Sequence, residues 1–352
     1  MVNQGSSHEA GSEVTMEISP HPIPHFVLIG CGGAGITVID RIGKDHIPEV
    51  KTVTADTDNK ALTSTRSDVQ ILLGNNLITG WRDGNPAESA QAVIEERSAF
   101  EHLFEPGGIV FIIAGLGGGA GSGSAPEIAK IAHEKGSLVI AIALFPFRIQ
   151  RKTVKNAEEG LSELLRFSDS VIVMDNDRYR NILSHLSAEK VYAKVNGIAV
   201  DVISRLIESI SLPYLINIDP DDFPALFRNK GMAIILSGES GDADGNQNEQ
   251  VVRHCLNSPS FDIDYRSASG CIVLITAGQQ FKRDDTGEIV SLLTNEINPA
   301  ADVVWCSNKN TSMNGRVLVY GIMTGIQYQF SGGNNPGAKD HVKTEKTYEG
   351  HY

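Results

Sequence analysis

Glycine is concentrated in two short stretches of this chain, and each stretch lies between an apolar run and a helical pattern. The first is Gly30-Cys31-Gly32-Gly33-Ala34-Gly35, which fits the pattern GxGxxG. The second is Gly117-Gly118-Gly119-Ala120-Gly121-Ser122-Gly123, with five glycines among seven residues. Glycine is costly in conformational entropy, and a bare turn does not need five of them. Backbone N–H groups without a Cβ in front of them can instead surround a phosphate.

Strand-like apolar runs alternate with helical patterns over the first half of the chain. This alternation predicts a parallel sheet with helices on both faces, in which ligands bind at the carboxyl ends of the strands. The predicted strands are residues 26–29, 52–55, 110–114, 138–144 and 170–174. Both glycine stretches directly follow such a strand, so we expect them at the ligand-binding edge of the sheet.

A long amphipathic stretch over residues 188–210 predicts one helix, and the pattern changes after it. The chain then becomes rich in β-branched runs, with one helical pattern among them. The fold class expected is therefore α/β: a parallel-sheet nucleotide-binding domain joined by a long central helix to a smaller α+β domain. The predicted boundaries are a disordered leader over 1–24, the nucleotide-binding domain with the central helix over 25–210, the second domain over 211–330 and a flexible tail over 331–352.

The charge balance and the cysteine pattern exclude several classes of protein. The 352 residues carry a net charge of −13, which argues against a nucleic-acid partner. The four cysteines form no CxxC pair, and such sparse cysteines suit a reducing compartment. Residues 1–24 lack the pattern of a signal peptide, and no apolar run approaches the roughly 20 residues of a membrane span. We therefore expect a cytoplasmic protein without direct membrane insertion.

Each motif has a second interpretation when it is taken alone. The first glycine stretch would suit a dinucleotide-binding domain with Asp56 or Asp58 on the ribose, or a tight turn with no ligand. Tyr192 and Asn196 lie one helical turn apart, so they share a face and could contact a purine, or be a half-buried tyrosine and a surface asparagine. Two glycine stretches at neighbouring strand ends favour one nucleotide held from both sides.

The second glycine stretch resembles the signature of the tubulin/FtsZ superfamily, GGGTGTG or GGGTGSG followed by AP, with alanine and serine at the two threonine positions. The resemblance extends from about Phe26 to Gln327. Further ordered matches to FtsZ are Asp56-Thr57-Asp58, Gly84-Asn85-Pro86, Pro146-Phe147, Asn176-Asp177-Arg178, Ser258-Pro259 and Ile275-Thr276-Ala277-Gly278.

This resemblance implies a GTPase whose active site is shared by two subunits of a head-to-tail filament. Asn217-Ile218-Asp219-Pro220-Asp221-Asp222 matches the NxDxxD of the loop that completes a neighbour's site; alone it would be a solvated loop or a helix cap. The resemblance assigns catalysis to Asn217, Asp219 and Asp222, with the two aspartates orienting the attacking water. It assigns binding of GTP or GDP to Gly32, Gly33, Ala34, Gly35, Asp58, Asn85, Gly117, Gly118, Gly119, Ala120, Gly121, Ser122, Gly123, Pro146, Gln150, Tyr192 and Asn196. It also implies Mg²⁺ as a cofactor, without assigning residues to the metal. We expect a Cβ at Gly119 or Gly121 to intrude on the phosphates and leave the fold largely intact.

The chain departs from the FtsZ pattern at Thr37, Asp56, Gln150 and Pro220-Asp221, and residues 331–352 do not resemble the FtsZ peptide that docks onto membrane adaptors. We therefore expect a divergent FtsZ-like protein that forms filaments with itself and has adaptor proteins that the sequence does not identify. Two alternatives stay open: a filament protein that hydrolyses its nucleotide slowly or not at all, and an NAD-dependent oxidoreductase built on Gly30–Gly35.

Overall fold

The computed structural model describes residues 24–45, 50–74, 85–149, 151–211, 215–241, 246–258 and 264–327. Residues 1–23 of the leader expected over 1–24, the whole tail expected over 331–352, and Gln150 lie outside the described residues. The strands are β1 Phe26–Cys31, β2 Val50–Asp56, β3 Val69–Leu72, β4 Ile109–Gly115, β5 Leu138–Phe145, β6 Ser170–Asp175, β7 Gly231–Gly241, β8 Gly270–Ala277, β9 Asp302–Lys309 and β10 Arg316–Thr324. The helices are α1 Gly32–Asp45, α2 Asn59–Thr63, α3 Pro86–Glu95, α4 Arg97–Glu101, α5 Ala125–Glu134, α6 Arg151–Phe167, α7 Asn176–Ile182, α8 Ala188–Ser211, α9 Asp222–Phe227, α10 Gln247–Leu256 and α11 Arg283–Thr294.

The described strands form one mixed ten-stranded sheet in the order β3-β2-β1-β4-β5-β6-β7-β10-β8-β9. The strands from β3 to β7 pair in parallel, β10 is antiparallel to both of its neighbours, and β9 is parallel to β8. The pairing of β6 with β7 covers only Ser170–Ile172 and Gly231–Ala233, and it joins the two halves of the sheet. The mostly parallel α/β architecture expected from the sequence is confirmed.

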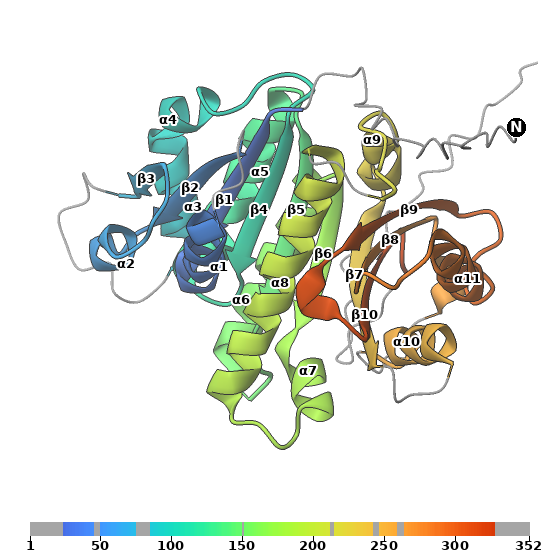
Figure 1. Cartoon of the computed structure of the whole chain (residues 1–352). Helices are drawn as coiled ribbons and strands as arrows, with labels where there is room; N and C mark the ends of the chain where they lie inside the picture. Colours follow the sequence, from blue (N-terminus) through green and yellow to red (C-terminus); the bar gives the residue numbers. More distant parts are fainter. Residues whose placement is uncertain are drawn as a thin grey trace, which may run out of the picture.

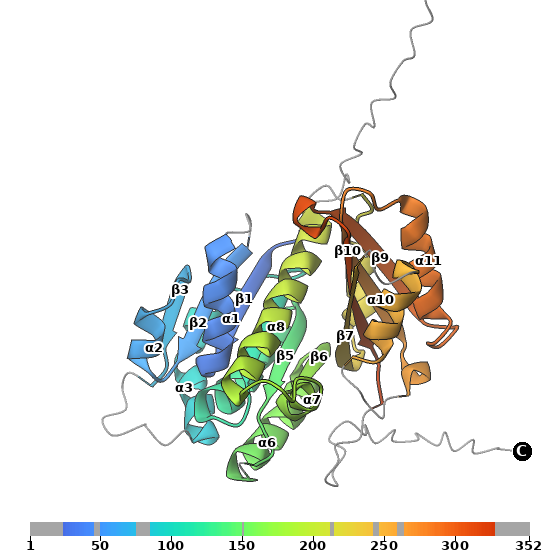
Figure 2. The same ribbon diagram turned by 60° about the horizontal axis from the view of Figure 1, so that its bottom comes forward.

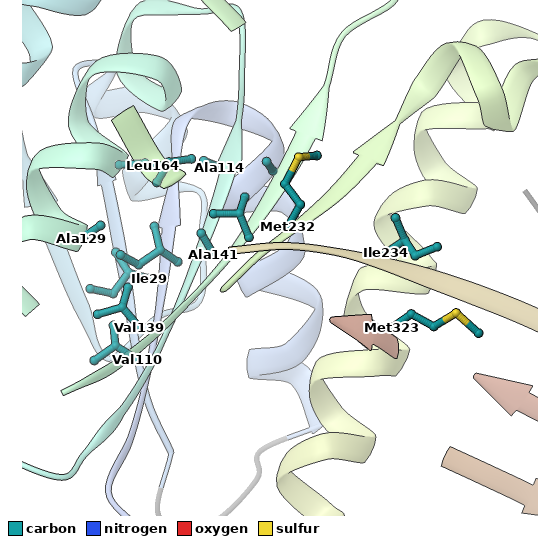
Figure 3. Packing of buried hydrophobic residues seen from close by; sticks show 14 of the residues in the cluster. Ile29, Val110, Ala114, Ala129, Val139, Ala141, Leu164, Met232, Ile234 and Met323 are labelled. Carbon is teal, nitrogen blue, oxygen red and sulfur yellow. The ribbon is translucent and has the colours of Figure 1, made fainter. Parts of the chain in front are cut away.

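Alternating side chains of the strands enter two different cores, one on each face of the sheet. Along β1, Val27 and Ile29 lie in the core that α3 to α6, α10 and α11 cover, while Phe26 and Leu28 lie in the core that α1, α8 and α9 cover. Figure 3 shows the first core, with Ile29, Val110 and Val139 from the central strands packed beside Ala129 and Leu164 from the helices. This burial on both faces explains why the strands read as continuous apolar runs.

Helix α8 passes between the two halves of the molecule. In Figures 1 and 2 it lies against the parallel strands on one side and beside β7 and β10 on the other. Its residues Val195, Val202 and Leu206 are among those buried in the second core. Polar contacts add to this packing, since Tyr320 Oη of β10 donates to Asp201 Oδ2 over 2.9 Å and Arg205 bonds to the Thr276 hydroxyl of β8. The predicted long central helix is therefore confirmed.

Candidate functional site

The two glycine stretches lie where the strand order reverses direction in the sheet. The order runs outward from β1 through β2 to β3 on one side, and from β4 through β5 to β6 on the other. In doubly wound sheets the crevice for a ligand opens at this point, beyond the carboxyl ends of the strands. The first glycine stretch follows β1 and the second follows β4, and these two strands are neighbours.

The two stretches touch each other. A Cβ on Gly32, whose φ is +71°, would stand 3.0 Å from the amide nitrogen of Gly121. A Cβ on Gly121 would stand only 2.0 Å from the carbonyl oxygen of Gly115, and one on Gly115 would stand 2.8 Å from the Ala34 side chain. The backbones therefore approach too closely for side chains, which is a packing reason for these glycines.

This finding corrects one expectation from the sequence. A Cβ at Gly121 would collide with backbone in the protein itself, so its substitution would disturb the fold as well as any ligand. The second stretch is also less open than expected, since Ala120–Ser124 is already a short π-helical turn ahead of α5. Within the turn Gly117 N donates to Ser122 Oγ over 2.7 Å, and Ser122 N donates to Gly118 O over 3.1 Å. In the described structure, Ser122 organises the loop.

Gly33 and Gly118 are different, because neither is needed for packing. A Cβ built on either residue would meet no atom within 4 Å, and both residues are exposed. Neither has a positive φ, so the backbone does not require glycine there either. Bare backbone at two such positions, one in each stretch, leaves room for a ligand to approach the main chain.

Other predicted site residues border these two stretches. Asn85 caps α3 with its side chain, and the carbonyl of Pro86 next to it is 1.9 Å from where a Cβ on Gly123 would stand. Pro146 follows β5, and its Cγ is 3.2 Å from the position of a Cβ on Gly117. Asp58 follows β2 and is occupied as the cap of α2, where it accepts from Lys60 N over 2.9 Å. The structure thus brings these three loops to one edge of the sheet.

Tyr192 and Asn196 lie on α8 near the same edge. The Tyr192 ring meets Phe147 edge-on with the ring centroids 4.8 Å apart, and 38% of Tyr192 is exposed. Asn196 is only 9% exposed, so the interpretation as a surface asparagine is wrong. The second turn of α8 is joined to α1 by Arg41, whose Nη1 donates to Ala193 O over 3.1 Å. An aromatic ring and a largely buried amide on one helix face could contact a purine from two directions.

The sequence argument did not include Asn176 and Arg148 among the site residues. Asn176 follows β6 and is 2% exposed; its Nδ2 donates to Phe145 O over 2.6 Å, while its Oδ1 has no hydrogen-bond partner in the described structure. A buried acceptor without a donor is an atom that a bound ligand could satisfy. Arg148 Nη2 lies 3.2 Å from Asp175 Oδ2, and Arg178 Nε lies 3.3 Å from the same oxygen. The match at Asn176-Asp177-Arg178 was the signal that could have identified this corner.

Burial changes the titration of two groups at this edge. Burial raises the pKa of the Cys31 thiol to about 12, so this cysteine of the first glycine stretch is an inert core residue. Burial also raises the pKa of Asp56 at the end of β2. The hydrogen bonds that Asp56 accepts from Asp58 N and Thr57 act in the opposite direction, but their effect on the pKa is smaller. An aspartate here is therefore harder to ionise than an exposed one.

The acidic residues Asp219 and Asp222 lie at the opposite edge of the sheet. They follow α8, which has 24 residues and at about 1.5 Å per residue carries the chain about 36 Å away from Ala188. Helix α9 begins at Asp222 and ends against the start of β6, where Ser170 Oγ donates to Phe227 O over 2.7 Å. Figure 1 shows α9 at one end of the molecule and α7 at the other. Asp219 and Asp222 are exposed, so they face away from the protein that carries them.

Comparisons with known proteins agree with this geometry. Residues 25–184 match the GTPase domain of the tubulin/FtsZ family, and residues 231–327 match the C-terminal domain of the FtsZ family. Cell division protein FtsZ 2 of Halobacterium salinarum is 34% identical over 305 residues, which are 86% of this chain and 77% of that protein. Among solved structures, the empty FtsZ dimer of M. jannaschii has a TM-score of 0.80 at 30% identity, over 86% of this chain and 88% of its own.

A more distant structure shares the fold. CetZ2 from Haloferax volcanii, solved as a GTPγS-bound protofilament, has a TM-score of 0.70 at 20% identity, and the match covers 86% of this chain and 94% of the CetZ2 chain.

Within the described ranges, no helix is long and apolar enough to cross a membrane. In the same part of the chain, no group of three or more His, Cys, Asp or Glu side chains is arranged to hold a metal ion.

Proposed function

We propose that this chain, which belongs to the tubulin/FtsZ family of GTPases, binds GTP between its two glycine stretches. It hydrolyses the GTP at the contact between two subunits of a filament. Family membership supports GTP-dependent filament formation, and it leaves no place for the oxidoreductase alternative. The assignment of residues to the two parts of the site follows the resemblance to FtsZ and remains a proposal.

The observation that carries this proposal is the separation of the glycine stretches from the acidic loop. Gly33 and Gly118 lie beyond the carboxyl ends of the parallel strands, whereas α9 is fixed to the opposite edge at Ser170. Strand β5, with eight residues at about 3.3 Å each, sets these edges about 26 Å apart. One chain therefore cannot bring Asp222 to its own nucleotide. A second copy stacked head to tail can, and because such a contact does not close, it generates filaments.

The proposed chemistry needs little more than positioning. Phosphoryl transfer to water requires stabilisation of the phosphates and orientation of the attacking water. Backbone N–H groups of the two glycine stretches would surround the phosphates, and α1 and α5 begin near this position. The carboxylates of Asp219 and Asp222 from the next subunit would hold the water in line with the bond that breaks. Asn217 would act differently, since its Nδ2 donates to Ser209 O over 3.1 Å and thereby holds the loop on α8.

For the base we propose contacts from α8. Asn196 can both donate to and accept from a guanine edge, and Tyr192 can cover the ring. The unpaired Oδ1 of Asn176 would accept a hydrogen bond from a ligand N–H.

Mg²⁺ in nucleotide sites is held largely by phosphates and water with one or two protein ligands. A site of that kind needs no larger cluster of acidic side chains.

Three further expectations stay proposals beside this one: a cytoplasmic location, adaptor proteins that link the filament to other structures, and no nucleic-acid partner. The overall acidity, with a net charge of −13, supports the last of these. The segment boundaries expected at residues 24/25, 210/211 and 330/331 also remain proposals.

The test is phosphate release from GTP and from ATP over a range of protein concentrations, with electron microscopy of the same samples. We expect GTP to be preferred, turnover per subunit to rise with concentration, and filaments to form over the same range. A filament that binds GTP without releasing phosphate would support the alternative of a non-hydrolysing structural protein. Equal use of ATP would contradict the assigned base contacts.

A further inference from the structure

The acidic segment, residues 215–230, is held to the rest of the protein at both of its ends. At its beginning Asn217 Nδ2 and Ile218 N both donate to Ser209 O, the carbonyl of the last turn of α8. Leu215 N and Ile216 N both donate to Ser307 O of β9. These bonds place the loop between the end of α8 and the edge strand of the sheet.

The other end of the segment is fixed by Ser170 and Asp169, whose partners there lie 57 and 60 positions further along the chain. Ser170, at the start of β6 and fully buried, donates its hydroxyl proton to Phe227 O over 2.7 Å. Asp169, only 2% exposed, accepts from Val139 N over 2.9 Å with one carboxylate oxygen and from Asn229 N over 3.3 Å with the other. Its backbone oxygen accepts from Gly231 N over 3.0 Å.

These contacts fix the position of α9, which behaves as one rigid helix. The helix has six residues, and its Phe223 and Phe227 rings are fully buried with centroids 4.9 Å apart. Asp222 is in its first turn and Phe227 ends it. A helix of this length cannot adjust one end while the other is held, so the bond at Phe227 also restricts Asp222. The adjoining β6–β7 pairing is short, with three residue pairs, and cannot supply the same restraint alone.

We propose that Asp169 and Ser170 are positioning residues for GTP hydrolysis. They hold α9 in place, and α9 in turn holds the Asp222 carboxylate where it can reach the nucleotide of a neighbouring subunit. The inference rests on the proposed function. Neither residue contacts nucleotide, and both act through the acidic segment. Loosening this anchor leaves GTP binding unchanged and lowers turnover, because a small misplacement of a group that orients a reactant is costly.

Ser137 offers a matched control at the neighbouring strand. Like Ser170 it is buried, with 1% exposed, and its hydroxyl donates to a backbone carbonyl, Glu105 O, over 3.0 Å. It directly precedes β5 at the same edge of the sheet, but its partner lies in the turn after α4. Ser137→Ala therefore removes the same kind of bond without touching the acidic segment.

The experiment compares Ser170→Ala, Ser137→Ala and the parent in full-length form. We expect similar melting temperatures for the two variants, unchanged GTP affinity for both, and turnover per subunit at saturating protein about tenfold lower for Ser170→Ala only. In an Asp222→Ala background Ser170→Ala should cause no further loss, because it acts through that carboxylate. Asp169→Asn, which keeps one acceptor oxygen, is the second variant should Ser170→Ala not fold, and it should show the same loss of turnover with retained binding.

The outcomes separate this inference from the proposed function. A parent protein that releases no phosphate from GTP overturns both. A parent that turns over GTP while Ser170→Ala matches Ser137→Ala overturns the anchor alone. A loss that is equally large with and without Asp222 would show that Ser170 acts elsewhere, and would also contradict the inference.

Discussion

Gly32 and Gly121, from opposite halves of the parallel sheet, approach so closely that a Cβ on the first would lie 3.0 Å from the amide nitrogen of the second. Because of this contact, two glycine stretches that are far apart in the sequence form a single site. It also divides the glycines into those that the fold needs and those that a ligand would need. Gly121 belongs to the first group, and Gly33 and Gly118 belong to the second.

This division predicts different outcomes for two substitutions. Gly118→Ala should keep the fold, because a Cβ there meets nothing within 4 Å. It should weaken GTP binding by about 10- to 100-fold, because the Cβ would hold the phosphate away from the backbone N–H and so lengthen or break a charge-assisted hydrogen bond. Gly121→Ala should lower the free energy of unfolding by about 1–3 kcal/mol or more, because its Cβ would overlap Gly115 O. Nucleotide titration and thermal unfolding measure the two effects.

Gly287 is the control for these variants. It lies in α11, exposed, and a Cβ there also meets nothing within 4 Å. Gly287→Ala should leave GTP binding unchanged and raise stability by up to about 1 kcal/mol through helix propensity. Unchanged GTP affinity in Gly118→Ala would mean that the second stretch does not contact the phosphates.

Asn196 should determine the choice of base. Asn196→Ala should weaken GTP binding by about 10- to 100-fold, because a guanine edge would lose its hydrogen-bonding partner in a largely buried position. ATP binding should change little, so the preference for GTP should disappear. Lys194→Ala, at an exposed position of the same helix, is the control and should leave both affinities as they are. Retained preference for GTP in Asn196→Ala would place base recognition elsewhere.

Asp56 should make stability depend on pH. Burial raises the pKa of this carboxyl in the folded protein, so its contribution to stability is complete in acid and is lost as the pH rises through the folded pKa. Asp56→Asn keeps an acceptor for Asp58 N and does not ionise. It should therefore be more stable than the parent near neutral pH, with a difference that shrinks below about pH 4. Thermal unfolding between pH 3.5 and pH 7 measures this, and a difference that grows in acid would contradict it.

The sequence predicted the elements whose pattern is local. The central strands and α8 were identified because each is a long apolar or amphipathic run. Strand β7 was missed, although it is the longest strand at 11 residues, because serine and glycine interrupt the second half of Gly231–Gly241. Its place was set by pairing with β6 and β10, which no local pattern reveals. Helices α3, α6 and α10 were also not predicted, although α6 has 17 residues and α3 and α10 each begin with an asparagine cap.

The candidate site was predictable as a set of loops but not as a set of contacts. Residues that follow strands of a parallel sheet gather at one edge, so the glycine stretches, Asp58, Asn85 and Pro146 could be grouped in advance. The bond between Gly117 N and Ser122 Oγ could not, because it depends on a π-helical turn that the sequence does not specify. The anchor at Ser170 could not be predicted either, because its hydroxyl bonds to a carbonyl at the end of α9, 57 positions further along the chain.

The central claim is that each active site takes its phosphate loops from one subunit and its acidic loop from the next. Asp222→Ala should bind GTP as tightly as the parent and release almost no phosphate, because ground-state binding is retained while the group that orients water is lost. At a GTP concentration that saturates the parent but lies well below the weakened dissociation constant of Gly118→Ala, this second variant should also be nearly inactive, because it holds little nucleotide.

Phosphate release by a 1:1 mixture of Asp222→Ala and Gly118→Ala tests this claim most directly. In a mixed filament about one contact in four joins an intact nucleotide site to an intact acidic loop, so the mixture should recover up to about a quarter of the parental turnover. The parent's turnover per subunit should fall on dilution. A mixture no more active than its two components, together with full parental turnover in dilute solution, would place the whole site in one chain and contradict the account.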